Sequence, residues 1–193
     1  MFKKSILLTL LAVMVSFQAC SKDKTDSHSD VKNLQEANAM ISTETYLLTG
    51  LDKTTYKITK EMDGFVLENA KEKVIIFDIF ATWCPPCQAS ASHISSLQEK
   101  YKNDVVIIGL NIEDNIPNAK LEEFKKTYKA NYILVNSPKN RLLADAIVSK
   151  LELGDRYPIP IMAIYKDGKL INHYIGLVQE EFVESDIKKA LGK

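Results

Sequence analysis

Residues 80–87 read FATWCPPC, and they place two cysteines three positions apart where a helix is predicted to begin. Pro85 and Pro86 suit the first turn of a helix, because the N–H groups there have no intrahelical partner and φ is already near helical values. Cys84 is thus predicted at the helix N-terminus, with Cys87 one turn further on. The partial positive charge at that terminus stabilises a thiolate, the nucleophile of disulfide exchange. We therefore expect Cys84 to attack and Cys87 to resolve.

A buried strand is predicted directly before this motif. Residues 74–80 read VIIFDIF, an almost continuous apolar run that is typical of a strand buried on both faces. Asp78 interrupts the run. A carboxyl group in such a strand loses its hydration, so its pKa should rise, which suits a proton carrier. The alternative is that Asp78 lies at a strand end and faces water, although charged side chains are seldom fully buried without a task.

Two nearby cysteines can also form a structural disulfide or half of a zinc site. A zinc site needs about four ligands, usually as two pairs, but the sequence has no second Cys pair, and His28, His93 and His173 are scattered. A structural bridge that closes so small a loop adds little stability. The order of strand, cysteines and helix therefore favours a redox-active disulfide, with no metal and no other cofactor.

The N-terminus has the features of an export signal. Two lysines precede an apolar stretch that is too short to span a bilayer comfortably, so residues 1–19 are predicted to be a signal peptide. Ala19 suits ordinary cleavage, but Phe17, two positions earlier, is too large. Cys20 instead resembles the lipidated cysteine of a bacterial lipobox, although Phe17 and Gln18 depart from that pattern. Lipidation would account for the odd cysteine; the alternative is a free thiol in an uncleaved segment.

Composition limits the possible functions. A chain of 193 residues that is 46% hydrophobic can bury one good core. Its 25 basic and 25 acidic residues form no cationic stripe, so nucleic-acid binding has no electrostatic support. No glycine-rich phosphate loop is present, which argues against nucleotide use. Residues 21–33 are polar and predict a flexible tether, and residues 31–42 predict a weak amphipathic helix.

The rest of the chain alternates between predicted strands and helices, the pattern of an α/β domain. A hairpin is predicted from residues 46–49 and 56–59, followed by one more short element within 62–68. The later elements are strands at 74–80, 105–110, 132–135, 161–165 and 170–175, and helices at 85–101, 119–129, 140–151 and 179–191. Asp167 and Gly168 between the last two strands are a strong hairpin signal. The buried faces predicted for the last two helices include Leu142 and Phe182. Residues 111–118 are predicted to be a loop without a function.

These features resemble the thioredoxin superfamily. The sequence WCPPC at residues 83–87, in an exported and tethered chain, is similar to the TlpA/ResA-type thiol-disulfide oxidoreductases, and the resemblance covers about residues 46–191. It implies a thioredoxin-like α/β fold, with a central mixed sheet flanked by helices and an N-terminal β-hairpin extension. Thioredoxins have a buried Asp at the position of Asp78, which implies that this carboxyl helps to deprotonate Cys87. ResA-like proteins often carry a Glu where this chain has Ser90, so Asp78 would act alone.

The resemblance also implies a cis-proline before the penultimate strand. Residues 157–160 read YPIP, and Pro160 aligns best with that proline, with Pro158 as the rival. The backbone of Ile159 would then pair with an extended substrate. Trp83 precedes a cysteine that we expect to be exposed, which favours a role in shielding the site and contacting substrate over a place in the core. The predicted substrate-binding residues are Trp83, Pro85, Pro86, Ile159 and Pro160.

The sequence thus predicts a signal peptide at 1–19, a lipidated tether with a weak helix at 20–45, and a thioredoxin-like domain at 46–193. We expect a periplasmic or extracytoplasmic enzyme, lipid-anchored to a membrane through Cys20, that reduces protein disulfides. The resemblance implies apocytochrome c among the substrates and a membrane thiol reductase as electron donor. The alternatives are a disulfide oxidase and a copper chaperone that binds metal through both sulfurs. The lack of a nearby His and the Pro-Pro spacer count against the chaperone.

Overall fold

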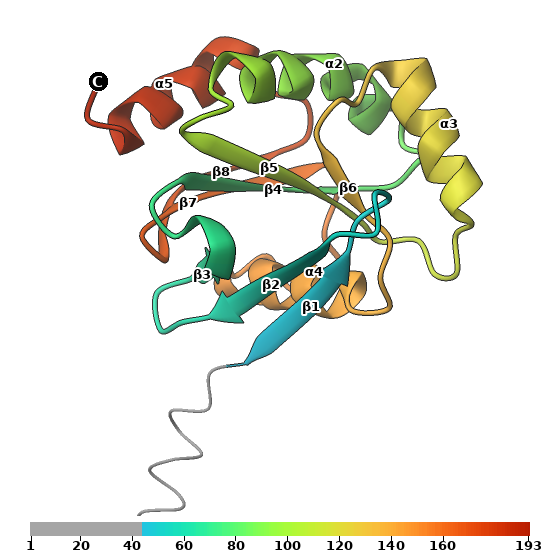
Figure 1. The fold of residues 1–193 in the computed structure, drawn as a ribbon, viewed down its shortest axis with the longest axis horizontal. Coiled ribbons are helices and arrows are strands. Elements are labelled where there is room, and N and C mark those ends of the chain that lie inside the picture. The colour runs from blue at the N-terminus through green and yellow to red at the C-terminus, as the bar shows by residue number, and fades with distance from the viewer. Residues whose placement is uncertain (1–43) are drawn as a thin grey trace, which may run out of the picture. The chain divides into compact units, whose positions relative to one another are not determined.

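The computed structural model describes residues 44–193, which form a five-stranded central sheet, a smaller three-stranded sheet and four α-helices (Figure 1). The predicted signal peptide, Cys20 and the predicted helix at 31–42 lie outside the described residues. Within residues 44–193, no helix is long and apolar enough to cross a membrane.

The central sheet is mixed, as the sequence predicts, and its strands run in the order β6-β5-β4-β7-β8. β4 is parallel to β5 and β5 to β6, whereas β7 is antiparallel to both β4 and β8. All residues of β4 are buried because helices and the smaller sheet cover both of its faces. The strands are β4 (Val74–Phe80), β5 (Val105–Asn111), β6 (Ile133–Val135), β7 (Ile161–Lys166) and β8 (Lys169–Ile175).

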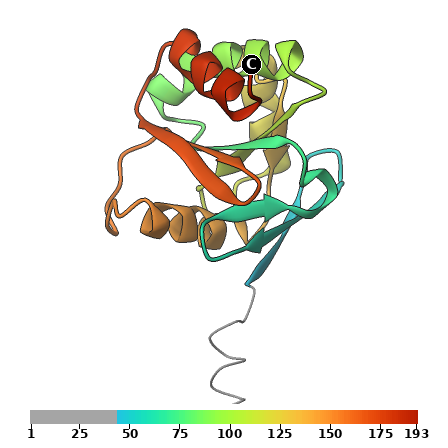
Figure 2. The same ribbon diagram turned by 90° about the vertical axis from the view of Figure 1, so that its left-hand side faces the viewer.

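The helices divide between the two faces of this sheet. The first face is covered by α2 (Pro85–Lys100), α3 (Asn118–Tyr128) and α5 (Glu180–Ala190), and the opposite face by α4 (Asn140–Lys150) (Figures 1 and 2). Each face has its own apolar core, one including Val74, Ile76 and Phe80 of β4 and the other its alternate residues Ile75, Phe77 and Ile79. This division follows from the two-residue period of a strand.

The predicted N-terminal hairpin is present and is larger than expected. Its strands are β1 (Thr45–Thr49) and β2 (Thr55–Lys60), and the further short element is a third strand, β3 (Phe65–Leu67), followed by a short 3-10 helix, η1 (Glu68–Ala70). The end of β1 also contacts β6, where Gly50 forms a bridge with Val135 and the N–H of Leu51 donates to the carbonyl of Leu134 at 3.0 Å. The turn of the hairpin therefore contacts the outer edge of β6.

Two predicted core residues are exposed. Leu142 and Phe182 both lie at the surface, because the buried stripe of α4 includes Leu143 and Ile147 and that of α5 includes Val183 and Ile187. An apolar residue next to a buried stripe fits an amphipathic pattern almost as well as the stripe itself. The predicted turn at Asp167 and Gly168 is confirmed, and both residues have the positive φ that such a two-residue hairpin requires, 52° and 73°.

Candidate active site

The two cysteines lie where β4 is followed by α2. Cys84 is the N-cap of α2 and has an extended backbone, and the helix begins at Pro85. The side chains of Cys84 and Cys87 form a disulfide, with their Cα atoms 5.3 Å apart. The backbone N–H of Cys87 donates to Sγ of Cys84 at 3.4 Å. The helix N-terminus therefore points a free N–H donor at the sulfur on which a thiolate would form.

Both cysteines are buried in this disulfide form, so the expectation of an exposed Cys84 is wrong. Cys84 is 3% exposed and Cys87 is 2% exposed. The loop before β7 contributes to this burial, because Sγ of Cys84 lies 3.7 Å from the carbonyl oxygen of Ile159. Trp83, by contrast, is 66% exposed, which excludes the reading of this side chain as an ordinary core aromatic.

A carboxylate from the neighbouring strand end holds the turn before Cys84. Glu113 accepts hydrogen bonds from the backbone N–H of Thr82 at 2.6 Å, from the Thr82 hydroxyl at 3.1 Å and from the Asn111 amide at 2.8 Å. The side chain of Gln88 donates to the Thr82 carbonyl at 2.7 Å. The prediction of a loop without function at 111–118 missed this contact. The contact depends on the strand order, since the ends of the parallel neighbours β4 and β5 meet at one sheet edge, and no local sequence signal marks it.

Asp78 is buried, and its carboxyl lies on the same side of the sheet as the cysteines. It is 2% exposed, and the alternation along β4 puts it with Val74, Ile76 and Phe80 in the core that also contains Cys84 and Cys87. The alternative of a water-facing Asp78 is therefore wrong. Burial raises the pKa of Asp78 to about 7, although a hydrogen bond from Tyr132 opposes the shift. A carboxyl with this pKa can exchange a proton near neutral pH.

The two carboxyl oxygens of Asp78 differ in their surroundings. Oδ2 accepts a hydrogen bond from the hydroxyl of Tyr132 at 2.9 Å, whereas Oδ1 has no partner in the described part of the chain. No second acid lies beside it: Asp78 is the only buried carboxyl group among residues 44–193. Ser90, at the position where ResA-like proteins often have Glu, is buried and donates to the carbonyl of Cys87 at 3.0 Å.

The loop before β7 contains the predicted cis-proline. The Ile159–Pro160 bond is cis, and Pro158, the rival position, is preceded by a trans bond. The carbonyl of Pro160 accepts from the N–H of Gly176 at 2.8 Å, which joins this loop to the end of β8. The backbone N–H and carbonyl of Ile159 have no backbone partner among residues 44–193. Ile159 thus presents a free backbone edge beside Cys84.

The described residues offer no alternative site for a metal. Within 44–193, no three side chains of the types His, Cys, Asp and Glu are grouped as metal ligands would be. His93 is exposed and His173 is half-buried on β8. The expectation that the redox-active disulfide works without a further cofactor stays a prediction.

Comparison with known families decides the class of protein. The model of the Redoxin family matches residues 51–191, which is most of the chain. The chain belongs to the Redoxin family. This Redoxin-family chain is 26% identical over 150 residues to the thiol-disulfide oxidoreductase ResA of Bacillus cereus, a match that covers 72% of this chain and 81% of ResA. It is 34% identical over 80 residues to Thioredoxin-1 of Drosophila melanogaster, covering 40% and 69% of the two chains.

Solved structures confirm the thioredoxin-like fold. A thioredoxin-family thiol:disulfide interchange protein from Chlorobium tepidum superposes with a TM-score of 0.61 at 19% identity, covering 78% of this chain and 95% of that one. The exposed lipoprotein thioredoxin Etrx1 of Streptococcus pneumoniae gives 0.54 at 22% identity, covering 76% and 99%. With the family match, the likeness to ResA and the disulfide at the start of α2, the Redoxin-family chain is a thiol-disulfide oxidoreductase of the ResA type.

Proposed function

We propose that this enzyme reduces disulfides of exported proteins, with Cys84 as nucleophile, Cys87 as resolving thiol and Asp78 as the proton acceptor for Cys87. The observation that carries the proposal is the disulfide at the N-terminus of α2, with a buried carboxyl of pKa about 7 on the same side of the sheet. Ile159 before the proline and the buried Asp78 are thioredoxin-like features, which favours reduction over oxidation.

The reaction has two exchange steps. In the first, the Cys84 thiolate attacks one sulfur of the substrate disulfide, forms a mixed disulfide and releases the other sulfur as a thiolate. In the second, Cys87 passes its proton to Asp78, and the Cys87 thiolate attacks Sγ of Cys84 and expels the second substrate thiolate. Two electrons pass to the substrate, and the enzyme is left as the Cys84–Cys87 disulfide seen in the structure.

The surroundings of Cys84 support binding of an extended chain. Ile159 offers an unpaired backbone N–H and carbonyl, which suits pairing with a substrate strand. Trp83 and Pro85 are exposed beside the disulfide, while Pro86 is half-buried and Pro160 is buried. We assign substrate contact to Trp83, Pro85 and Pro86 through their side chains, and assign Pro160 to holding Ile159 in place.

The electron donor and the substrates follow from the resemblance to TlpA/ResA-type proteins. Each reductive turn oxidises the cysteine pair, so a thiol donor must reduce it again; we assign this role to a membrane thiol reductase. Apocytochrome c is the proposed substrate, since its cysteines must be reduced before they can bond to haem.

The reduction potential of the Cys84–Cys87 pair tests the direction of the reaction. As a reductase, the protein should have a potential nearer to the value of about −270 mV for thioredoxin than to the value of about −120 mV for the oxidant DsbA. The measurement is equilibration in glutathione or dithiothreitol buffers, followed by alkylation and mass analysis. A potential near that of DsbA would contradict the proposal and favour the disulfide oxidase.

We also propose that the enzyme works outside the cytoplasm, on a membrane, with residues 1–19 removed and Cys20 lipidated. The sequence around Cys20 supports this location, as does the likeness to Etrx1, itself an exposed lipoprotein. Residues 20–45 would tether the domain at 46–193 to the membrane. More than one acyl chain would give stable anchoring where a single chain would not.

Mass analysis of the native protein tests the anchor. The mature chain should begin at an acylated Cys20 and fractionate with membranes, whereas Cys20→Ala should lose the lipid and leave the membrane fraction. The Cys20→Ala variant should keep full disulfide-exchange activity, because Cys84 and Cys87 are unchanged. A soluble wild-type protein that begins at another residue would show that Cys20 is not the anchor.

A further inference from the structure

Tyr132 reaches the buried Asp78 across a neighbouring strand. Tyr132 directly precedes β6, and β5 lies between β6 and β4 in the central sheet. The hydroxyl of Tyr132 nevertheless donates to Oδ2 of Asp78 at 2.9 Å, and both side chains are buried. Because the two residues are 54 positions apart, the contact depends on the tertiary fold.

A glycine on β5 makes room for this contact. Gly109 is the partner of Asp78 on the β4 side and of Leu134 on the β6 side. A Cβ atom at position 109 would lie 3.0 Å from Cε2 of Tyr132 and 2.7 Å from Cδ2 of Leu134. Any larger residue would therefore press on the ring of Tyr132. The missing side chain at Gly109 leaves the space through which Tyr132 reaches Asp78.

Titratable groups around Asp78 are few. Its strand neighbours are Gly109 and Met162, and the buried titratable side chains packed on its side of the sheet are Tyr132, Cys84 and Cys87. At the margin of this core lie Lys100 of α2 and its C-cap Tyr101, Tyr128 of α3, Tyr174 of β8, and Glu184, Asp186 and Lys188 of α5, and Lys102 and Lys125 line the pocket beside Tyr132. Glu184 bonds Tyr101 and pairs with both lysines, and Asp186 bonds Tyr174, so these two acids already have partners.

We propose that Tyr132 is a positioning residue for proton transfer: its hydroxyl holds Oδ2 of Asp78 and leaves Oδ1 as the acceptor for the proton of Cys87. This inference rests on the proposed role of Asp78. The pKa of Asp78 agrees with it, since burial raises that pKa and the hydrogen bond from Tyr132 is the contact that lowers it. Tyr132 thus determines the pH at which the carboxylate becomes available to Cys87.

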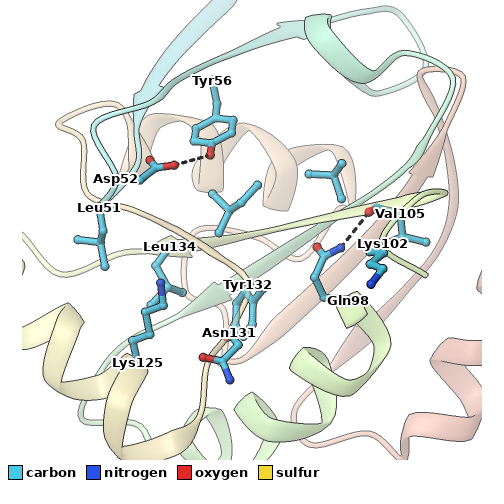
Figure 3. Close-up of a pocket in the computed structure, with 12 residues that line it drawn as sticks. Leu51, Asp52, Tyr56, Gln98, Lys102, Val105, Lys125, Asn131, Tyr132 and Leu134 are labelled. Atoms are coloured by element: carbon cyan, nitrogen blue, oxygen red, sulfur yellow. Dashed lines mark hydrogen bonds between the residues drawn. The ribbon is translucent and has the colours of Figure 1, made fainter. Parts of the chain in front are cut away.

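The hydroxyl of Tyr132 can be removed without changing the nearby surface. The ring of Tyr132 lines a pocket of about 360 Å³ together with Gln98, Lys125 and Leu134 (Figure 3). Neither cysteine lines this pocket, so it is separate from the disulfide-exchange site. The hydroxyl itself is bonded to the buried Asp78. Tyr132→Phe therefore keeps the pocket wall and removes only the hydrogen bond.

Tyr132→Phe should shift the pH dependence of the resolution step upward. The hydrogen bond from Tyr132 stabilises the charged form of Asp78. Loss of this bond should therefore raise the midpoint of the pH profile by about one to two pH units. The rate at pH 7 should fall by about tenfold and recover near pH 9. The measurement is the second phase of coloured thiolate release when the reduced enzyme is mixed with an aromatic disulfide. Carbon NMR of the Asp78 carboxyl in the oxidised protein should show the same shift without any turnover.

Tyr165→Phe is the matched control. Tyr165 is also buried in a strand of the central sheet, but it lies in the other core, and its hydroxyl has no partner among residues 44–193. Its pH profile should match that of the wild type. Gly109→Ala is a second variant, because its Cβ would press on Tyr132. It should shift the midpoint in the same direction as Tyr132→Phe.

The double variant separates positioning from a general structural effect. In an Asp78→Asn background, adding Tyr132→Phe should leave the resolution rate unchanged, because the hydroxyl acts only through the carboxyl. A further drop in the resolution rate of the double variant would overturn the inference, and so would an unchanged pH midpoint in Tyr132→Phe. In either case a slow Asp78→Asn variant would still support the role of Asp78. If Asp78→Asn itself resolves at the wild-type rate, the proposed role of Asp78 fails and the inference fails with it.

Discussion

Cys87→Ser is expected to stop turnover and to leave substrate proteins attached to Cys84 as mixed disulfides. The Cys84 thiolate still forms at the N-terminus of α2 and still attacks, but the internal thiol that would expel the substrate is gone. Cys84→Ser should trap nothing. Both cysteines are buried in the oxidised form, so the difference rests on position: Cys84 lies beside the exposed Trp83 and the free backbone of Ile159, whereas Cys87 lies within α2.

Affinity capture of both variants from cells, followed by non-reducing gels, measures this difference. A variant with both cysteines replaced by serine is the control for adducts that do not involve the pair. Equal adducts on Cys84→Ser and Cys87→Ser would contradict the assigned roles. Absence of adducts together with tight, stoichiometric copper binding would favour the copper chaperone, in which loss of either sulfur weakens metal binding alike.

Asp78→Asn should slow the resolution step by about 100-fold at neutral pH, a typical contribution of a general base. The pKa of Asp78 is about 7, so the wild-type rate should rise as the pH passes through 7 and the carboxylate forms. The Asn variant cannot accept the proton and should lack this rise. At higher pH, hydroxide can remove the proton from Cys87, so the two rates should converge. Identical rates across the pH range would mean that Asp78 is structural.

Unfolding of the oxidised proteins provides the control for Asp78→Asn. The pKa of Asp78 rises from 3.8 in the unfolded chain to about 7 in the folded one, so the folded state binds the extra proton between these values. The corresponding stability is fully present below about pH 4 and is lost as the pH rises through 7, an effect on the order of a few kcal/mol. Asp78→Asn should lack this loss in urea titrations, and its slower catalysis then cannot be attributed to unfolding.

The parts of the site that the sequence predicts are those encoded by neighbouring residues. The apolar run of β4, Asp78 within it and the prolines after Cys84 together specify a buried strand, a carboxyl and a helix start, and all of these are present. The location of the cis bond before Pro160 required the family resemblance, because X–Pro bonds are cis in only about 5–6% of cases.

The partners of these residues could not be predicted, because they depend on the order of strands in the sheet. Tyr132 lies next to β6, and β5 separates β6 from the strand of Asp78. Tyr132 reaches Asp78 only because β5 carries Gly109 at the crossing point. Glu113 reaches Thr82 only because the ends of β4 and β5 meet. Neither distance in the sequence nor residue type marks these pairs in advance.

The contact between the hairpin turn and β6 has a consequence for the proposed binding of extended substrate chains. An open sheet edge pairs readily with any unfolded segment, through the same backbone hydrogen bonds that a reductase uses to hold its substrate. Here the N–H of Leu51 donates to the carbonyl of Leu134 and the N–H of Asn136 donates to the carbonyl of Thr49, so these backbone groups at the outer edge of β6 are not available to incoming strands. Under the proposed function, a misfolded client would thereby be kept from docking at this part of β6 in an unproductive complex, while the backbone of Ile159 would stay open to it directly beside the reactive sulfur.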